Sequence, residues 1–238
     1  MHAPRIGIFF RTMCRRTSIT WERQLLWRGM NIKTNAVAFG LACAALTTPA
    51  AWAAGKPTVS VQDLAVSVVK THDSHGQPFA VIDKVQARLF VFQPDGRIHG
   101  SSPILLGSAR GDDSVPGIGL RKMEDIRPAE RTTPAGRFVI EPGRNAQGED
   151  IFWIDYDAAV SMHRVRATNP KERRLARLAT ATPADNRISY GCINVPVAFF
   201  NTVVKPVFQG RQGVMYVLPE TRPAQTVFSA LKANKPGS

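Results

Sequence analysis

From residue 79 onward, the apolar residues of this chain come in short runs separated by glycine, proline and aspartate, and this spacing limits the fold most strongly. The runs are rich in β-branched and aromatic residues, which is typical of β-strands. Strands are predicted at 79–83, 87–93, 97–106, 137–141, 151–155, 159–163 and 214–218. Pro94–Gly96 predicts the turn of a hairpin. The sequence therefore predicts a predominantly β domain with a few short helices.

The helices are fewer and shorter. Residues 171–180 place Leu175, Leu178 and Ala179 at helical spacing. The opposite, basic face of this segment holds Lys171, Arg173, Arg174 and Arg177. A second helix is predicted after Pro196, whereas 60–71 fits either a helix or a strand. Residues 107–131 predict a long surface loop, and 142–143 and 145–148 are expected to separate strands.

The first 53 residues do not resemble part of a fold. Lys33, the apolar run 36–46 and the small-residue site Ala51–Ala53 predict a secretory signal that starts near Met30 and is cleaved after Ala53. The run is shorter than the roughly 20 residues that span a bilayer, so no stable membrane span is expected. We expect an exported, periplasmic protein in which 54–78 leads into a main domain at 79–219. Residues 220–238 are expected to form a loosely held tail.

Charge and cysteine usage narrow the function. The formal net charge of +13 falls to +7 without the first 53 residues, which hold seven basic residues and one acidic residue. A basic exported surface favours an anionic partner in the envelope and disfavours nucleic acid. Cys14 and Cys43 precede the predicted cleavage site, so Cys192 has no partner for an internal disulfide. Its thiol is either buried and inert or reactive.

The surroundings of Cys192 suit nucleophilic chemistry. Cys192 is expected just before a helix N-terminus, with His163 upstream as a base, and both would lower the thiol pKa. Gly191 permits a close backbone approach, and the amides of Tyr190, Gly191 and Cys192 could stabilise an oxyanion. Ser189 could position the turn or donate as well. Taken singly, the cysteine and the histidine are equally compatible with structural roles.

Three motifs together resemble one family. Residues Ser189–Asn194, Ser-Tyr-Gly-Cys-Ile-Asn, are similar to the Ser/Thr-His-Gly-Cys signature of the L,D-transpeptidase (YkuD-like) catalytic domain. Thr133–Phe138, Thr-Pro-Ala-Gly-Arg-Phe, resembles its Thr-Pro-x-Gly-x-Phe strand entry, and 81–92 resembles its opening hairpin. The resemblance covers 79–219 and would make this segment a catalytic domain.

The resemblance implies a mixed β-sandwich without cofactor or metal. Cys192 would be the nucleophile and His163 its base, with the His163 Nδ1 held by a backbone carbonyl. Family members attack the bond between an L-centred and a D-centred residue of a peptidoglycan stem, release the D-amino acid and pass the acyl group to an amine of a second stem. Donor and acceptor stems would therefore be the partners of this chain.

The sequence departs from the family in two places. Tyr190 stands where the family has histidine, and the gap between His163 and Cys192 is longer and holds the basic segment 171–177, expected as a lid or rim. These departures leave open whether the crosslink joins residues 3 and 3 or residues 1 and 3 of the stems. Tyr190 and Asn194 are candidates for binding substrate. Arg164, Arg166 and Arg187 are candidates for pairing with stem carboxylates.

Other interpretations remain at this stage. The same acyl-enzyme could be hydrolysed, as in an L,D-carboxypeptidase, or the domain could bind cell wall without catalysis. A papain-type peptidase has its cysteine before its histidine, the reverse of the order here, and the surroundings of Arg211 do not resemble a sortase strand. The histidines at 72, 75 and 99 with Asp73 raise a metal-site hypothesis, but a polar surface turn explains this spacing better.

Overall fold

The computed structural model describes residues 59–228, and the predicted signal peptide and the last ten residues lie outside this range. The strands are β1 Phe79–Asp83, β2 Arg88–Phe92, β3 Ile98–Pro103, β4 Leu106–Gly107, β5 Gly136–Arg144, β6 Asp150–Asp155, β7 Val160–Arg164, β8 Arg187–Ser189, β9 Ile193–Val195 and β10 Gly213–Val217. The helices are α1 Val59–Thr71, α2 Arg174–Ala179, α3 Val197–Phe199, α4 Lys205–Phe208 and α5 Ala224–Val227. A π-helical turn at Phe200–Val204 joins α3 to α4. Short 3-10 helices lie at Ile118–Leu120, Met123–Asp125, Pro128–Glu130, Pro170–Glu172 and Pro183–Asn186. Within the described residues, no helix has the length and apolar content needed to cross a bilayer.

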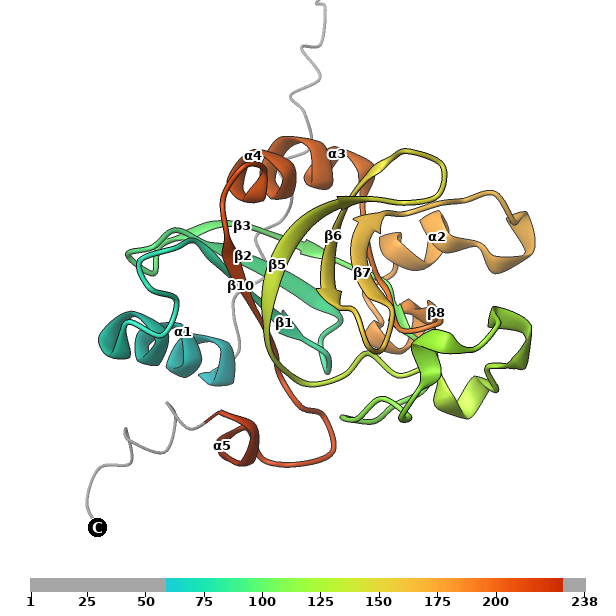
Figure 1. Ribbon diagram of the computed structural model, residues 1–238, viewed down its shortest axis with the longest axis horizontal. Coiled ribbons are helices and arrows are strands. Elements are labelled where there is room, and N and C mark those ends of the chain that lie inside the picture. The colour runs from blue at the N-terminus through green and yellow to red at the C-terminus, as the bar shows by residue number, and fades with distance from the viewer. Residues whose placement is uncertain (1–58, 229–238) are drawn as a thin grey trace, which may run out of the picture. The chain divides into compact units, whose positions relative to one another are not determined.

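Eight strands form one mixed sheet in the order β3-β2-β1-β10-β5-β6-β7-β9 (Figure 1). The pairs β1–β10 and β7–β9 are parallel, and the other neighbours are antiparallel. Leu105, just after β3, exchanges both backbone hydrogen bonds with Asn194 in β9 at 2.9 Å, so the two edges of the sheet meet. The predicted mixed β class is confirmed, and the sheet is nearly closed.

The core lies on both faces of β1, β2 and β10. Alternate residues of these strands, such as Ile82 and Met215, face the interior of the curved sheet together with Phe199 and Phe208. The intervening residues form a second cluster beneath α1. Because both faces are covered, these strands are nearly continuous apolar runs.

Helix α1 resolves the ambiguous segment 60–71. Val61, Leu64, Ala65 and Val68 are buried against the outer face of the sheet, at the three- and four-residue spacing of a helix. The segment before residue 79 therefore shares a core with the main domain.

Three other expectations differ from the structure. Pro142-Gly143 does not end a strand, because β5 continues to Arg144. Beyond Ile140 only β6 pairs with β5, so the other side of the strand is an edge, where proline is tolerated. The segment expected as a loosely held tail, 220–238, contains α5, and Phe228 is buried in the cluster beneath α1. In α2, Leu175 is 59% exposed, and the side chains of Arg174 and Arg177 make the inward contacts.

Candidate active site

Cys192 lies in the turn between β8 and β9, and its side chain is partly exposed. The expected helix N-terminus is not at the sulfur, because β9 intervenes and α3 begins only at Val197. A helix dipole therefore does not account for the properties of the thiol.

The side chains around the sulfur come from β7 and the turn before it. Cys192 Sγ lies 3.7 Å from Ser161 Oγ and 3.6 Å from the carbonyl oxygen of Ala159. Ser161 and His163 are two residues apart in β7, so their side chains share a face of the strand. The parallel pairing of His163 with Asn194 in β9 brings this face to the turn that holds Cys192.

These neighbours determine the ionisation of the thiol. Burial alone would raise the pKa of Cys192, but the neighbouring His163 side chain and Ser161 backbone outweigh burial and lower the pKa below its ordinary value. The structure thus brings the predicted nucleophile and the predicted base together.

His163 is held in one tautomer. Its Nδ1 lies 2.8 Å from the carbonyl oxygen of Arg164, a backbone contact of the kind that the family resemblance implies. A carbonyl only accepts, so Nδ1 must carry a proton, and in the neutral ring Nε2 is left as an acceptor. An imidazole in this state can take the proton of a thiol.

The turn itself is fixed by side-chain hydrogen bonds. Ser189 Oγ donates to the Cys192 carbonyl at 2.6 Å and accepts from the Gly191 N–H at 3.1 Å. Thr133 Oγ1 accepts from the Gly107 N–H at 2.9 Å and donates to the Gly191 carbonyl at 2.8 Å. Gly191 has φ +128°, and a Cβ there would lie 2.9 Å from the Thr132 carbonyl oxygen, so both conformation and space require glycine.

These bonds limit which amides face an attacked carbonyl group. The Gly191 N–H is engaged by Ser189, so the expected donor set shrinks to the amides of Tyr190 and Cys192. Neither of these two donates a backbone hydrogen bond within residues 59–228. The Gly191 carbonyl and the Cys192 N–H belong to one planar trans peptide and point in opposite directions. By holding that carbonyl, Thr133 therefore orients the Cys192 N–H.

Three of the expected substrate contacts are occupied within the protein. The Arg187 guanidinium is 9% exposed, pairs with Glu220 at 2.6 Å and donates to the Lys84 carbonyl at 2.7 Å. Arg164 follows His163 in the strand, so it points to the other face, where it donates to Asn201 at 2.8 Å. Asn194 is 1% exposed and donates to the Cys192 carbonyl at 3.2 Å.

The other predicted residues have distinct surroundings. Tyr190 remains at the surface of the turn, where the Arg131 guanidinium lies 3.8 Å from the centre of its ring, a cation–π contact. Arg166 pairs with Glu149 in an exposed ion pair. Asp73, named in the metal-site hypothesis, accepts from Arg137 and Tyr216. Across residues 59–228, no three His, Cys, Asp or Glu side chains gather in a way that could hold a metal ion.

The sequence interpretation missed three positioning contacts. Ser161 could have been found, since a residue two positions before His163 in a strand faces the same way. Thr133 belongs to a quoted motif, but its contacts with Gly107 and Gly191 are long-range and leave no local signal. The same holds for the contact between Arg174 and Asn194.

No protein-family model and no curated protein matches the sequence. The structure is similar to the NMR structure of the catalytic domain of an L,D-transpeptidase from E. faecium, with 16% identity, a TM-score of 0.37, and coverage of 59% of this chain and 98% of that chain. It is also similar to Pgp2, the helical cell shape determining protein of Campylobacter jejuni, with 16% identity, a TM-score of 0.40, and coverage of 68% of this chain and 56% of that one. The K307A mutant of Pgp2 gives 13% identity, a TM-score of 0.41, and coverage of 74% and 63%. This chain thus spans less than two thirds of Pgp2. At these identities and TM-scores, the similarity shows neither an activity nor a residue role for this chain.

Proposed function

We propose that this chain is a cysteine-dependent L,D-transpeptidase that acts on peptidoglycan stem peptides in the cell envelope. The observation that carries the proposal is the partly exposed thiol of Cys192, whose pKa is lowered by a histidine that the Arg164 carbonyl holds in the base-competent tautomer. The motif resemblance supplies the substrate class, and the basic surface suits a carboxylate-bearing polymer.

In the first half-reaction, His163 Nε2 takes the Cys192 proton and the thiolate attacks the carbonyl carbon between the L-centred and the D-centred residue. The amides of Tyr190 and Cys192 stabilise the tetrahedral oxyanion. On collapse, the C–N bond breaks, the terminal D-amino acid leaves with the proton that His163 returns to its nitrogen, and a thioester forms on Cys192. His163 is thus the general base first and the general acid second.

In the second half-reaction, an amine of a neighbouring stem attacks the thioester carbonyl while His163 takes its proton. The amide forms, the C–S bond breaks, and the thiol is regenerated. Water in place of the amine would give hydrolysis and a trimmed stem, so the acceptor decides between transpeptidase and carboxypeptidase outcomes.

Tyr190 is proposed to contact the stem beside the nucleophile. The Arg131 guanidinium covers one face of the Tyr190 ring at 3.8 Å from the ring centre and donates twice to the Ile126 carbonyl, at 3.0 and 3.2 Å. The backbone of the turn and one face of the Tyr190 ring are both held in place. The ring therefore forms a fixed wall of the site, which suits it to select the stem residue that enters. We assign to the Tyr190 ring the choice between a 3,3 and a 1,3 linkage.

The test is mass analysis of purified stem peptides incubated with the protein without its first 53 residues, with and without an isotope-labelled acceptor amine. Crosslinked product that carries the label is expected from wild type, and none from Cys192→Ala or His163→Ala. Trimmed stems without labelled product would replace transpeptidation by hydrolysis. Unchanged crosslinking by Cys192→Ala would refute the nucleophile assignment, and an inert wild type with slow alkylation of Cys192 would favour a non-catalytic binding domain.

A further inference from the structure

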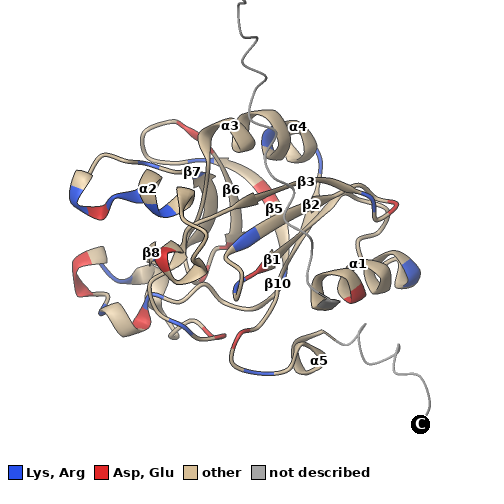
Figure 2. Cartoon of the chain, turned by 180° about the vertical axis from the view of Figure 1, so that it is seen from behind, with Lys and Arg blue, Asp and Glu red and all other residues tan. Residues whose placement is uncertain are grey.

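The segment between β7 and β8 contacts the strand that follows the nucleophile turn through the largely buried side chain of one arginine. This segment carries the basic residues that were expected to form a lid, and Figure 2 shows them as blue ribbon around α2. Helix α2 itself has no buried residue. The Arg174 side chain is nevertheless only 14% exposed, because it extends from α2 towards β9.

Arg174 holds Asn194 in one orientation. Arg174 Nη1 donates to Asn194 Oδ1 at 2.5 Å, and Asn194 Nδ2 donates to the Cys192 carbonyl at 3.2 Å. Arginine has no acceptor, so Asn194 must turn its oxygen towards Arg174, and this leaves its NH₂ group for the Cys192 carbonyl. The arginine thereby specifies a hydrogen bond that it does not itself make.

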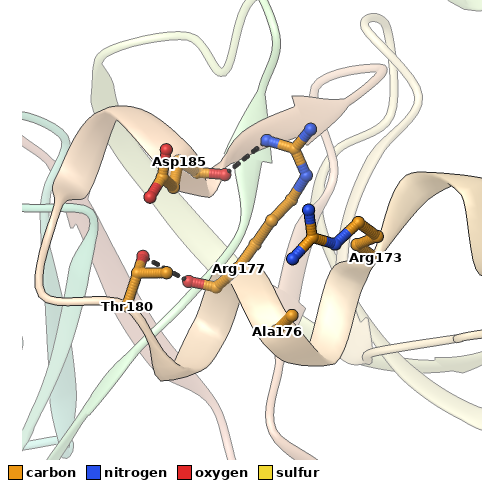
Figure 3. Close-up of a pocket in the computed structure, with 5 residues that line it drawn as sticks. All are labelled: Arg173, Ala176, Arg177, Thr180 and Asp185. Carbon is orange, nitrogen blue, oxygen red and sulfur yellow. Dashed lines mark hydrogen bonds between the residues drawn. The ribbon is translucent and has the colours of Figure 1, made fainter.

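The segment is stiff enough to hold Arg174 in place. Arg174 Nε donates to Glu172 Oε2 at 2.5 Å, and Arg177 donates to the carbonyls of Glu172 and Asp185, each at 2.8 Å. Figure 3 shows Arg177 reaching Asp185 across the segment, with Thr180 closing on the Arg177 carbonyl. The Glu172 carboxylate and carbonyl thus fix both inward arginines.

The neighbouring Arg173 provides a contrast. Its side chain lines a hollow of about 170 Å³ between α2 and Asp185, together with Ala176, Arg177 and Thr180 (Figure 3). Within the described part of the chain, no hydrogen bond joins the Arg173 side chain to the turn. Arg173 and Arg174 therefore carry the same charge in adjacent positions, and only Arg174 reaches Asn194.

We propose that Arg174 is a positioning residue for the nucleophile, and that it acts through the carboxamide of Asn194 on the peptide that follows Cys192. Loss of this contact frees Asn194 to rotate, and among residues 59–228 the Cys192 carbonyl then keeps only Ser189 as a partner. The sulfur then samples orientations away from His163 and Ser161, which lower its pKa. The role in turnover rests on the proposed transpeptidase function, whereas the effect on the thiol does not.

The experiment compares Arg174→Met with Arg173→Met, which removes the same charge one residue away. The rate of Cys192 alkylation by iodoacetamide is measured from pH 5 to 10, and kcat and KM are measured for stem crosslinking. For Arg174→Met we expect alkylation at pH 7 to fall about threefold or more through an upward shift of the midpoint, and kcat to fall about tenfold with KM unchanged. Arg173→Met should stay within about twofold of wild type, and Arg174→Lys should recover part of the loss, since one ammonium can reach Asn194.

Equal alkylation profiles for Arg174→Met and Arg173→Met would overturn the inference, whatever the turnover results. If Arg174→Met does not fold, as judged by circular dichroism, Arg174→Lys against Arg173→Lys makes the same comparison with charge retained. A wild type that alkylates rapidly but forms no crosslinks would refute the proposed function and leave the positioning role standing on the alkylation data.

Discussion

Replacing Thr133 with valine tests how the site orients its oxyanion donor. Thr133 is 1% exposed, and its hydroxyl joins the Gly107 N–H to the Gly191 carbonyl at 2.9 and 2.8 Å. Valine has nearly the same shape, so packing is retained and the two hydrogen bonds are lost. The Gly191 carbonyl is then free to tilt, and the Cys192 N–H in the same peptide plane tilts with it.

Both a stability effect and a catalytic effect follow. Each buried group left without a partner costs about 1–3 kcal/mol, so loss of both bonds should lower the free energy of unfolding by about 2–6 kcal/mol. Removing an oxyanion donor costs roughly 10²–10³ in kcat. Here the donor is misdirected and still present, so we expect kcat to fall about 10- to 100-fold. Thr133→Ser keeps the hydroxyl and should retain kcat within about threefold while losing about 1 kcal/mol of stability.

The assay must separate the two effects. Unfolding is followed by thermal and chemical denaturation, and kcat is measured at least 15 °C below the melting temperature of the least stable variant. Alkylation of Cys192 depends on the thiolate and not on an oxyanion, so its rate should stay near that of wild type in Thr133→Val. A valine variant with wild-type kcat, or one whose alkylation falls as far as its turnover, would refute the argument from the peptide plane.

Three further predictions concern buried charges and the thiol. Lys84→Met should lower the free energy of unfolding by about 3–5 kcal/mol in urea, because Lys84 is fully buried and its loss leaves Asp112 and Glu220 without their ammonium partner. Burial raises the pKa of Asp112, but bonds from Thr221, Lys84 and two backbone amides outweigh this and hold it far below its ordinary value. The Asp112 carboxyl therefore binds a proton near pH 4 in the unfolded chain but stays ionised at that pH in the native chain. The free energy of unfolding should fall as the pH drops below about 4, and it should fall less steeply in Asp112→Asn. The midpoint for alkylation of Cys192 should lie below that of free cysteine and rise in His163→Gln; an unchanged midpoint would contradict the assigned His163 contact.

The strands could be predicted because their signals are local. β-Branched runs bounded by turn residues located β1, β2, β6 and β10 to within about two residues, the usual uncertainty at element ends. The failure at Pro142 has a tertiary cause: proline is tolerated because β10 ends its pairing at Ile140, and the sequence around Pro142 does not show this.

Helical spacing alone did not identify the inner face of α2. Leu175 was expected to face the core, but the structure leaves it exposed and turns Arg174 and Arg177 inwards. The acceptors of these arginines are an asparagine of β9, the Glu172 carboxylate, and the carbonyls of Glu172 and Asp185. Polar groups held by hydrogen bonds can replace apolar burial at a helix face, and hydrophobic periodicity does not detect this exchange.

Within the site, strand alternation could have ruled out Arg164, which was named as a candidate for pairing with stem carboxylates. His163 faces the thiol, so Arg164 must face away from it, and the structure places Arg164 beside Asn201 on the other side. Arg187 required long-range knowledge, because its carboxylate partner Glu220 follows the last strand. Proximity of an arginine to the nucleophile in sequence was therefore poor evidence for contact with substrate.

The stiffness of the nucleophile turn follows from the way in which the sheet closes. Leu105 pairs with Asn194 where the two edges of the sheet meet, and this pairing buries the Asn194 side chain beside the Cys192 carbonyl. A buried carboxamide must satisfy both its oxygen and its NH₂ group, and here Arg174 and Cys192 do so. Closing the sheet therefore fixes the backbone that carries the nucleophile. Leu105→Pro removes the N–H that donates to the Asn194 carbonyl and so loosens this pairing. We expect this change to slow alkylation of Cys192 even where the overall fold survives.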